Sequence, residues 1–555
     1  MVALFLLFIP SPLSKLVQTP IGVSPSFGAT LNIALTNLKA GHYLLGSGPN
    51  TFGYIFNLYK PGGINQTIFW STAFNSGASA MTSWVGTIGI LGILAILVLI
   101  VAFIWTGVKG MAIRSASRSS LMSEARPFGA AQAIFVSVSF LFIMWFLYIA
   151  NFTVMVFAFW GMGLFLAASM FFVKELRTWN LELSEAPSSK LQAPSTFKEI
   201  RIFTSPPKTF LFSLLIVGLM VSVVVGIYFE TNRYVAEIYF SKALSTNSGQ
   251  ADYASAIQFW QYDERYFQSL SQTIFFQLND LLAKKDLPQE TLRAQFQNIT
   301  TNAISAARQA QGLNPQNPFN GVLLGNIYEN LIPFIADAAN FALSAYSGAV
   351  SLDPQNPSNY LALARVEIAQ ANLATSNKQQ ATEINGYLDK AASNLDKSLQ
   401  LKSDYAPARF LLVQVYDRQG KLADAIKKAE ELVMLNNTDV GALFQLGFLY
   451  YKNSQFDQSK LVLEKTVELS PNYSNARYFL GLIYDRNGDK TSAITQFTQI
   501  ESLNPDNSEI KLILKNLKAN KPALFGIAPP AQAPQSRSEA PVQEGVKAPV
   551  QKLKK

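Results

Sequence analysis

The stretch Gly46–Trp70, GSGPNTFGYIFNLYKPGGINQTIFW, holds residue types that can contact a phosphate group. Glycines leave backbone amides accessible to an anion, and Lys60 and the earlier Lys39 supply positive charge. His42 lies just before the glycines and is of the type that acts as a general base near neutral pH. The spacing nevertheless fails the nucleotide fingerprint Gly-x-Gly-x-x-Gly, because Thr51 stands where the third glycine belongs. We therefore expect no nucleotide site here.

The composition removes several other kinds of chemistry. The chain has no cysteine, which excludes disulfides and thiolate sites, and one histidine, which excludes a two-histidine metal motif. The first acidic residue is Glu124, so the preceding segment offers no carboxylate as a general base, metal ligand or nucleophile. We assign no catalytic residue, no metal and no cofactor. The net charge of +9 fits membrane topology better than nucleic acid, because much of it lies beside apolar stretches.

Four long stretches contain no charged residue and reach the length of about 20 residues that a membrane-spanning helix needs. They are residues 84–106, 128–150, 152–173 and 209–229. Asn151 alone separates the second from the third, which predicts a tight helical hairpin. Buried core helices are the other interpretation, but such helices usually keep a polar edge. We therefore predict four transmembrane helices within residues 84–229.

Basic residues near the ends of these stretches predict their orientation. Residues 107–127 contain four Lys or Arg and residues 174–208 contain six, whereas the much longer segment 11–83 contains three. Basic connections lie on the cytoplasmic side. We therefore expect a multi-pass protein of the cytoplasmic membrane, with the loop 12–83 and everything after residue 229 outside the cytoplasm. Residues 1–11 are apolar but too short to span, so we interpret them as the stub of a helix from a larger membrane protein.

The second half of the chain has an internal period of 34 residues. Leu401, Leu435, Leu469 and Leu503 follow one another at this spacing. Further columns recur in the same frame, and we expect them to pack helix against helix: Leu412, Leu446 and Leu480; Tyr416, Tyr450 and Tyr484; Ala425, Ser459 and Ala493. Gly420, Ser454 and Gly488 end the first helix of each pair. A helix–turn–helix period of 34 residues resembles a tetratricopeptide repeat.

These observations predict an all-α chain in which polytopic transmembrane helices precede a tetratricopeptide-repeat solenoid over residues 230–520. Stacked repeats form an extended surface that binds peptides or partner proteins, so we expect a protein partner of unknown identity. Residues 521–555 are rich in Pro, Ala and Gln and lack apolar periodicity, which predicts a disordered tail.

The loop and the stretch after it also resemble a known family. The succession GSGPNTF, YKP, NQTIFW and then TIGILG leading into a long apolar stretch resembles the O-antigen ligase and polymerase superfamily, over roughly residues 1–175. Enzymes of that family join a glycan carried on undecaprenyl pyrophosphate to an acceptor sugar, and several members carry tetratricopeptide repeats after the last helix. The resemblance implies that Lys60, and less directly Lys39, contact the pyrophosphate. It also implies a glycan-facing loop that consists of Gly46, Gly48, Pro49, Phe52, Tyr59, Asn65 and Trp70.

The chain departs from the ligase pattern at two places. Thr87 replaces the glutamate of the family's Glu-x-Gly-x-x-Gly segment, and no histidine occurs in the residues before it, Gly77–Ala80. We therefore favour a membrane-anchored repeat scaffold in envelope glycan assembly. Two alternatives stay open: an active glycan ligase or polymerase that is incomplete here at its N-terminus, and a repeat-bearing secretion or envelope-biogenesis factor.

Overall fold

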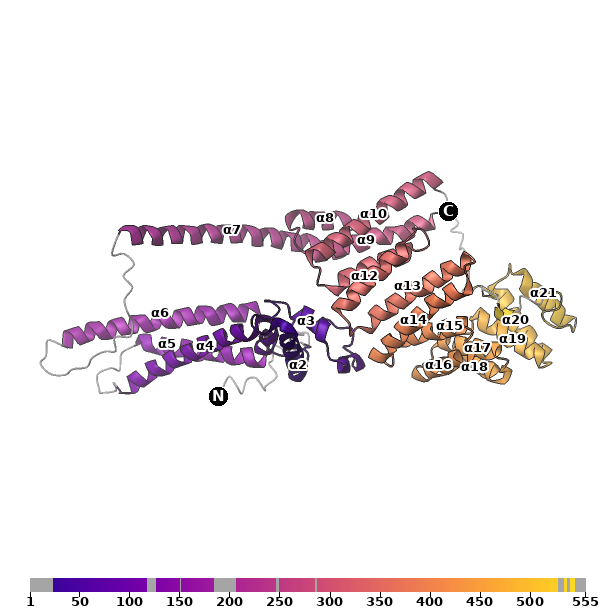
Figure 1. Cartoon of the computed structure of the whole chain (residues 1–555), viewed down its shortest axis with the longest axis horizontal. Coiled ribbons are helices and arrows are strands. Elements are labelled where there is room, and N and C mark those ends of the chain that lie inside the picture. Colours follow the sequence, from indigo (N-terminus) through magenta and orange to yellow (C-terminus); the bar gives the residue numbers. More distant parts are fainter. Residues whose placement is uncertain are drawn as a thin grey trace, which may run out of the picture. The chain divides into compact units, whose positions relative to one another are not determined.

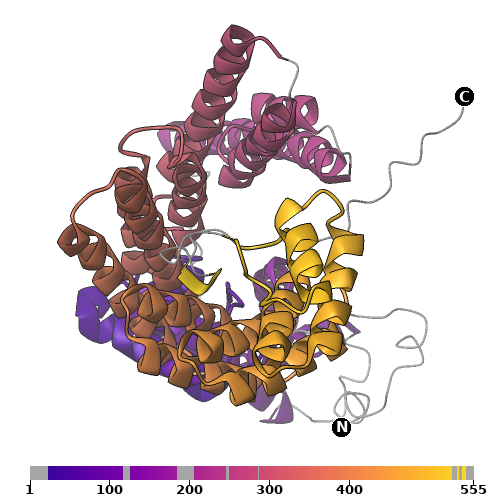
Figure 2. The same cartoon turned by 90° about the vertical axis from the view of Figure 1, so that its right-hand side faces the viewer.

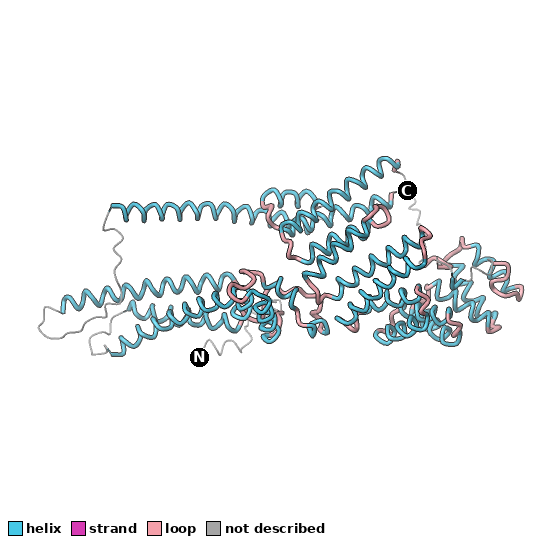
Figure 3. Tube along the Cα trace, in the orientation of Figure 1, coloured by secondary structure: helices cyan, strands magenta, loops and turns pink. Residues whose placement is uncertain are grey.

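The computed structural model describes residues 23–116, 126–149, 151–183, 206–245, 249–284, 287–527, 534–536 and 540–544. Throughout these ranges the regular structure is helical and no strand occurs (Figures 1 and 3). The chain divides into two compact units, of which the first is Met1–Asn320 with Ser351–Gln355 and the second Gly321–Val350 with Asn356–Lys555. We predicted one repeat domain over residues 230–520, whereas this division assigns the helices before Gly321 to the first unit.

The first unit begins with helices that surround the loop and the apolar stretches. They are α2 (Phe27–Asn37), the π-helical turn η2 (Leu38–His42), α3 (Phe52–Tyr59), the 3-10 turn η3 (Gly62–Gln66), α4 (Ala80–Ala116), α5 (Arg126–Leu147), α6 (Phe152–Leu183) and α7 (Pro206–Ser245). Helices α5 and α6 pack against each other, and α4 packs against α5. The side chain of Asn151 accepts a hydrogen bond from the Val154 amide at 2.9 Å, and so caps the start of α6.

Two helices in the described ranges are long and apolar enough to cross a bilayer. They are Ala80–Lys109 and Thr209–Ser245, whose most apolar 18-residue windows have mean hydropathies of 3.1 and 2.8. The apolar helices Ala131–Leu147 and Phe152–Ala168 are shorter. Two of the four predicted spans therefore meet the criteria of length and composition, and the polytopic arrangement stays a prediction. The predicted helix stub, residues 1–11, lies outside the described residues.

The first unit continues with α8 (Gln250–Phe259), α9 (Glu264–Ala283) and α10 (Gln289–Leu313). Helices α9 and α10 form a closely packed pair. The carboxylate of Glu264 accepts hydrogen bonds from the side-chain amides of Asn314, Asn317 and Asn320, each at 2.9 Å. These bonds fasten the turn after α10 to the start of α9.

The second unit is a succession of helix pairs, which follow one another around a curve (Figure 2). Its helices are α11 (Pro318–Leu331), which begins in the first unit, α12 (Ala338–Leu352), α13 (Pro357–Ser376), α14 (Ala381–Leu401), α15 (Ala406–Arg418), α16 (Leu422–Leu435), α17 (Val440–Lys452), α18 (Phe456–Leu469), α19 (Ser474–Arg486), α20 (Lys490–Leu503) and α21 (Ser508–Lys518). Each helix from α13 to α21 contacts the next one. The four leucines of the 34-residue period are the last residues of α14, α16, α18 and α20.

The Gly and Ser column ends the first helix of each pair by one backbone device. Gly420, Ser454 and Gly488 have φ angles of 74°, 61° and 80°, which is the left-handed conformation of a helix terminus. In each case the next residue donates its amide to a tyrosine carbonyl of the preceding turn, at 2.8–2.9 Å. The tyrosine column therefore marks the position from which the chain reverses into the second helix.

Glycine also permits close approach between paired helices. A Cβ atom on Gly481 of α19 would lie 2.7 Å from the ring of Phe497 on α20, and that ring is fully buried. The ring therefore has no space into which it could move. Gly386 of α14, by contrast, is exposed and has no neighbouring atom within 4 Å of such a Cβ.

We predict that Gly481→Ala destabilises the repeats by about 1–3 kcal/mol, because the added methyl group overpacks a filled contact. Gly386→Ala is the matched control and should stabilise them by up to about 1 kcal/mol through helix propensity. Thermal unfolding of the full chain, followed by circular dichroism at 222 nm, measures both changes. If the two substitutions shift the midpoint in the same direction, the close contact between α19 and α20 is not as described.

Candidate functional site

The segment Tyr43–Gly48, which we call the glycine loop, lies against a break in helix α4. At the break, Gly89 has φ 66° and ψ −172°, a conformation that is essentially confined to glycine. The backbone of the loop pairs with both sides of the break. The amides of Ser47 and Gly48 donate to the carbonyls of Gly86 and Thr87, at 3.2 and 2.8 Å. Beyond the break, the amides of Ile90 and Leu91 donate to the carbonyls of Tyr43 and Leu44, at 2.9 and 3.1 Å.

Two glycines make this pairing possible, because the backbones approach too closely for a side chain. A Cβ atom on Gly89 would lie 2.4 Å from the backbone nitrogen of Gly46. A Cβ atom on Gly46, whose φ is 68°, would lie 2.4 Å from the carbonyl carbon of Thr87. The glycines thus serve backbone contact. The amides of Ser47 and Gly48, which an anion would need, already have protein acceptors.

The two lysines have different environments. Lys60 is 5% exposed, and its Nζ donates to the carbonyl oxygen of Trp70 at 3.0 Å. Burial lowers the pKa of the Lys60 amine, and the charge of Asp353 opposes that shift. Lys39 and His42, by contrast, are exposed on η2. Lys60 is therefore held inside the folded loop by its bond to Trp70, whereas Lys39 is accessible to an anion.

The remaining candidate glycan contacts belong to the same folded loop as Lys60. Phe52 is buried in a cluster with Ile33, Ile55, Phe56 and Phe74, against which Tyr59 packs. Asn65 is fully buried and donates its side-chain amide to the carbonyl of Gln355 at 2.7 Å. Pro49 is exposed, and Trp70 is half-buried. The loop brings these residues into one body, in which Phe52 and Asn65 are buried.

Several contacts in the first unit had no signal in the sequence. Asn37 donates its side-chain amide to the carbonyl of Gly86 at 2.9 Å, and so holds the last turn before the helix break. Asn314, in the turn after α10, donates to the hydroxyl of Tyr54 on α3 at 2.8 Å. Single polar residues of this kind follow no period, so only the folded chain reveals their partners.

We predict that Gly89→Ala lowers the stability of the first unit by about 1–3 kcal/mol from backbone strain alone, and further through the backbone clash with Gly46. The control Gly63→Ala adds a methyl group where no atom lies within 4 Å, and should leave stability nearly unchanged. Tryptophan-fluorescence melting of the chain in detergent micelles distinguishes the two. Equal melting points for both variants would contradict the pairing of the loop with α4.

The repeat-packing residues lie where paired helices meet. Leu412, Leu480, Ala425 and Ala493 are at most 2% exposed, and Leu446 is 5% exposed. The hydroxyl of Ser459, on α18, donates to the carbonyl of Gly447 on α17 at 2.7 Å, in a fully buried position. Serine therefore replaces alanine in this column because the hydroxyl has an acceptor.

The tyrosines of the next column reach carboxylates on the preceding pair. The hydroxyl of Tyr450 donates to Glu430 at 2.7 Å, and that of Tyr484 donates to Glu464 at 2.6 Å. Burial, and then the bond to Glu430, raises the pKa of Tyr450 to about 12. The spacing of 20 residues is the same in both cases, so these bonds recur with the repeat and connect neighbouring pairs.

A family model and several known proteins resemble parts of this chain. Residues 444–508 match the family model "Tetratricopeptide repeat". A 125-residue segment is 26% identical to anaphase-promoting complex subunit 3 of Schizosaccharomyces pombe and covers 22% of this chain and 19% of that protein. A 112-residue segment is 30% identical to an uncharacterized protein of Haemophilus influenzae and covers 20% and 56% of the two chains. This chain thus spans about a fifth of the first relative and just over half of the second.

Solved structures give a similar comparison. The crystal structure of YrrB, described as a tetratricopeptide-repeat protein with an unusual peptide-binding site, is 18% identical over 38% of this chain and 98% of its own, with a TM-score of 0.30. The matched family model, the 34-residue period and the observed helix pairs agree with one another. The C-terminal part of this chain therefore consists of tetratricopeptide repeats.

Proposed function

We propose that this chain is a membrane-anchored repeat scaffold, which recruits proteins through its tetratricopeptide repeats during assembly of cell-envelope glycan. Helix α7 is the observation that carries the anchoring. The most apolar 18 residues of its segment Thr209–Ser245 have a mean hydropathy of 2.8, and none of them is buried. Large side chains such as Leu214, Leu219 and Val224 are 56–66% exposed.

A helix so apolar and so exposed requires a cover. Soluble proteins seldom expose apolar patches larger than a few hundred Å², and a bilayer supplies the cover without another protein. At 1.5 Å per residue the segment is about 55 Å long, against an apolar bilayer core of about 30 Å. The part that precedes Glu230 and Arg233 therefore fits the bilayer, and the remainder of α7 continues to α8, against which it packs.

The scaffold role fits the loop better than the ligase role does. The amine of Lys60 is occupied by the carbonyl of Trp70, and the amides of Ser47 and Gly48 are occupied by α4. These are the groups that a pyrophosphate site would have needed. The envelope glycan enters the proposal through the resemblance of residues 1–175 to O-antigen ligases, and the location in the cytoplasmic membrane follows from the distribution of basic residues.

The absence of cysteine allows a direct test of the anchor. We expect Ser222→Cys, in the middle of α7, to resist a membrane-impermeant maleimide in intact spheroplasts and to react once detergent is added. Ala254→Cys, on the exposed side of α8, should react without detergent, because we place α8 outside the cytoplasm. Labelling is measured by mass shift on a gel. Labelling of both positions before detergent would refute the anchor, and protection of both would refute the orientation.

The scaffold role predicts a second outcome, which uses the repeat period. Deletion of residues 436–469 removes one period and joins Leu435 to Ser470, so the remaining pairs can still stack. We expect normal membrane insertion but a loss of finished envelope glycan, with accumulation of the lipid-linked precursor, because the partner surface is shortened. Gly386→Ala serves as a control with intact repeats. Unchanged glycan in the deletion strain would count against a role of the repeats in its assembly.

A further inference from the structure

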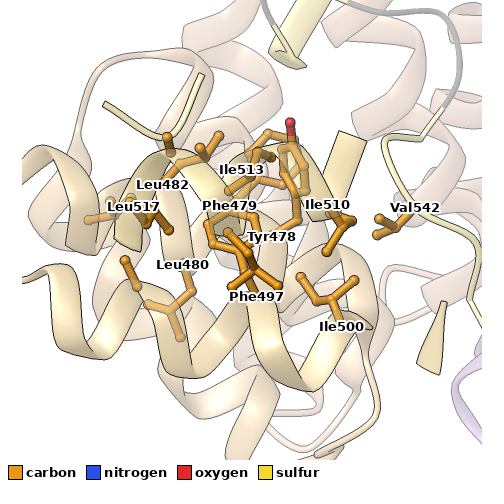
Figure 4. Packing of buried hydrophobic residues seen from close by; sticks show 14 of the residues in the cluster. Tyr478, Phe479, Leu480, Leu482, Phe497, Ile500, Ile510, Ile513, Leu517 and Val542 are labelled. Carbon is orange, nitrogen blue, oxygen red and sulfur yellow. The ribbon is translucent and has the colours of Figure 1, made fainter. Parts of the chain in front are cut away.

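Part of the C-terminal segment lies on the first helices of the last repeats. We expected residues 521–555 to be disordered, and this expectation does not describe residues 521–527, 534–536 and 540–544. Val542 is 3% exposed and belongs to the apolar cluster of α19, α20 and α21, where Figure 4 shows it beside Ile510. The 3-10 turn η5 (Pro534–Ser536) contacts α17. The tail packs because apolar and acidic side chains within it find partners on the repeats.

Asn475 of α19 forms hydrogen bonds with the backbone of the tail at Val542. Its Nδ2 donates to the carbonyl of Val542 at 2.9 Å, and its Oδ1 accepts the amide of Val542 at 3.3 Å. One side-chain amide thus satisfies both backbone groups of one residue. Such a bidentate contact fixes the position of the backbone at Val542 and does not depend on the side chain that the backbone carries.

Glu544 supplies a cap that helix α19 lacks in its own sequence. Its carboxylate accepts the backbone amides of Ser474 and Asn475, at 2.8 and 2.7 Å, and also the Asn475 side chain at 2.6 Å. The residue before α19 is Tyr473, which makes no capping bond with its side chain. In the preceding repeat Asp439 caps α17 locally, with bonds of 2.9 and 3.1 Å to the next amides. The start of α19 therefore accepts a carboxylate from a separate segment.

The tail itself contains a comparison sequence. Ala540–Glu544 reads APVQE, and Ala548–Lys552 reads APVQK. The two copies differ only at the fifth position, where Glu544 makes its three bonds. Gln543, between the two contact residues, is exposed. The docked segment thus consists of an apolar residue, Val542, then the exposed Gln543, and then Glu544.

We propose that the surface formed by Ser474, Asn475 and the cluster around Ile510 is a binding site for a peptide segment with the pattern apolar-x-Glu. The chain's own residues 541–544 are its resident occupant, so a segment of a partner protein binds by displacing the tail. This inference rests on the proposed scaffold function. It specifies the sequence pattern that the partner segment carries, and it makes the tail the segment that blocks the site. A tethered segment competes at an effective concentration of about a millimolar, so a partner must bind tightly or present several copies.

The test uses the full chain in detergent micelles and two fluorescent peptides. The first peptide is EAPVQEGV (residues 539–546), and the second, KAPVQKLK (residues 547–554), is the matched control. Fluorescence anisotropy measures binding to the wild-type chain and to Glu544→Lys, which copies the second tail sequence and vacates the site. We expect the first peptide to bind Glu544→Lys at least about tenfold more tightly than wild type. The control peptide should bind neither chain.

Two further variants make the result specific. Gln543→Lys introduces a positive charge at the exposed neighbouring position and should behave like the wild-type chain. Asn475→Ala, added to Glu544→Lys, should remove binding of the first peptide. Because this substitution can disturb α19, its melting point is compared with that of Glu544→Lys. Hydrogen exchange of the Val542 amide, which should be faster in Glu544→Lys than in wild type, gives a readout that needs no change in α19.

Equal binding of the first peptide to wild type and Glu544→Lys, or equal binding of the two peptides, would overturn the inference. The proposed scaffold function can fail separately. Loss of glycan upon deletion of residues 436–469, together with no peptide binding, rejects only the peptide site. Peptide binding together with unchanged glycan rejects only the role in glycan assembly.

Discussion

The backbone groups at helix ends need hydrogen-bond partners, and this constraint governs the parts of the chain that differ from plain helix pairs. In helix α4 the break at Gly89 frees amides and carbonyls, which the glycine loop satisfies from both sides. At Gly420, Ser454 and Gly488 the left-handed turn satisfies them locally. At the start of α19, Glu544 satisfies them from the tail.

The same constraint explains how much could be predicted from sequence. The 34-residue period identified the repeats and the residues that end their first helices, because local turns recur with the chain. The family resemblance implied that Gly46 and Gly48 belong to a glycan-facing loop, and glycine serves equally in an open loop and in close backbone contact. Only the structure shows that Gly46 meets Gly89. The docking of Val542 and Glu544 was missed because the prediction of disorder used the average composition of the tail. The position of the tail depends instead on these two side chains.

The surfaces of helix α7 and of the repeats differ in character. Helix α7 exposes apolar side chains over the whole of its apolar part, which a bilayer can cover. The repeats bury theirs between neighbours and present polar groups such as Asn475. Lys60, which the resemblance implies as a pyrophosphate contact, donates to the carbonyl of Trp70. On the repeats, the start of α19 and the side chain of Asn475 bind the tail by hydrogen bonds.

Ser454 makes one helix pair of the solenoid differ from its two neighbours in backbone strain. It adopts the left-handed conformation that Gly420 and Gly488 adopt at their ends, and for a residue with a side chain this costs about 1–2 kcal/mol. In a solenoid each unit shares its stability only with its neighbours, so a local cost is not averaged over the array. The α17–α18 pair therefore carries a backbone cost that the α15–α16 and α19–α20 pairs, whose first helices end in glycine, do not carry.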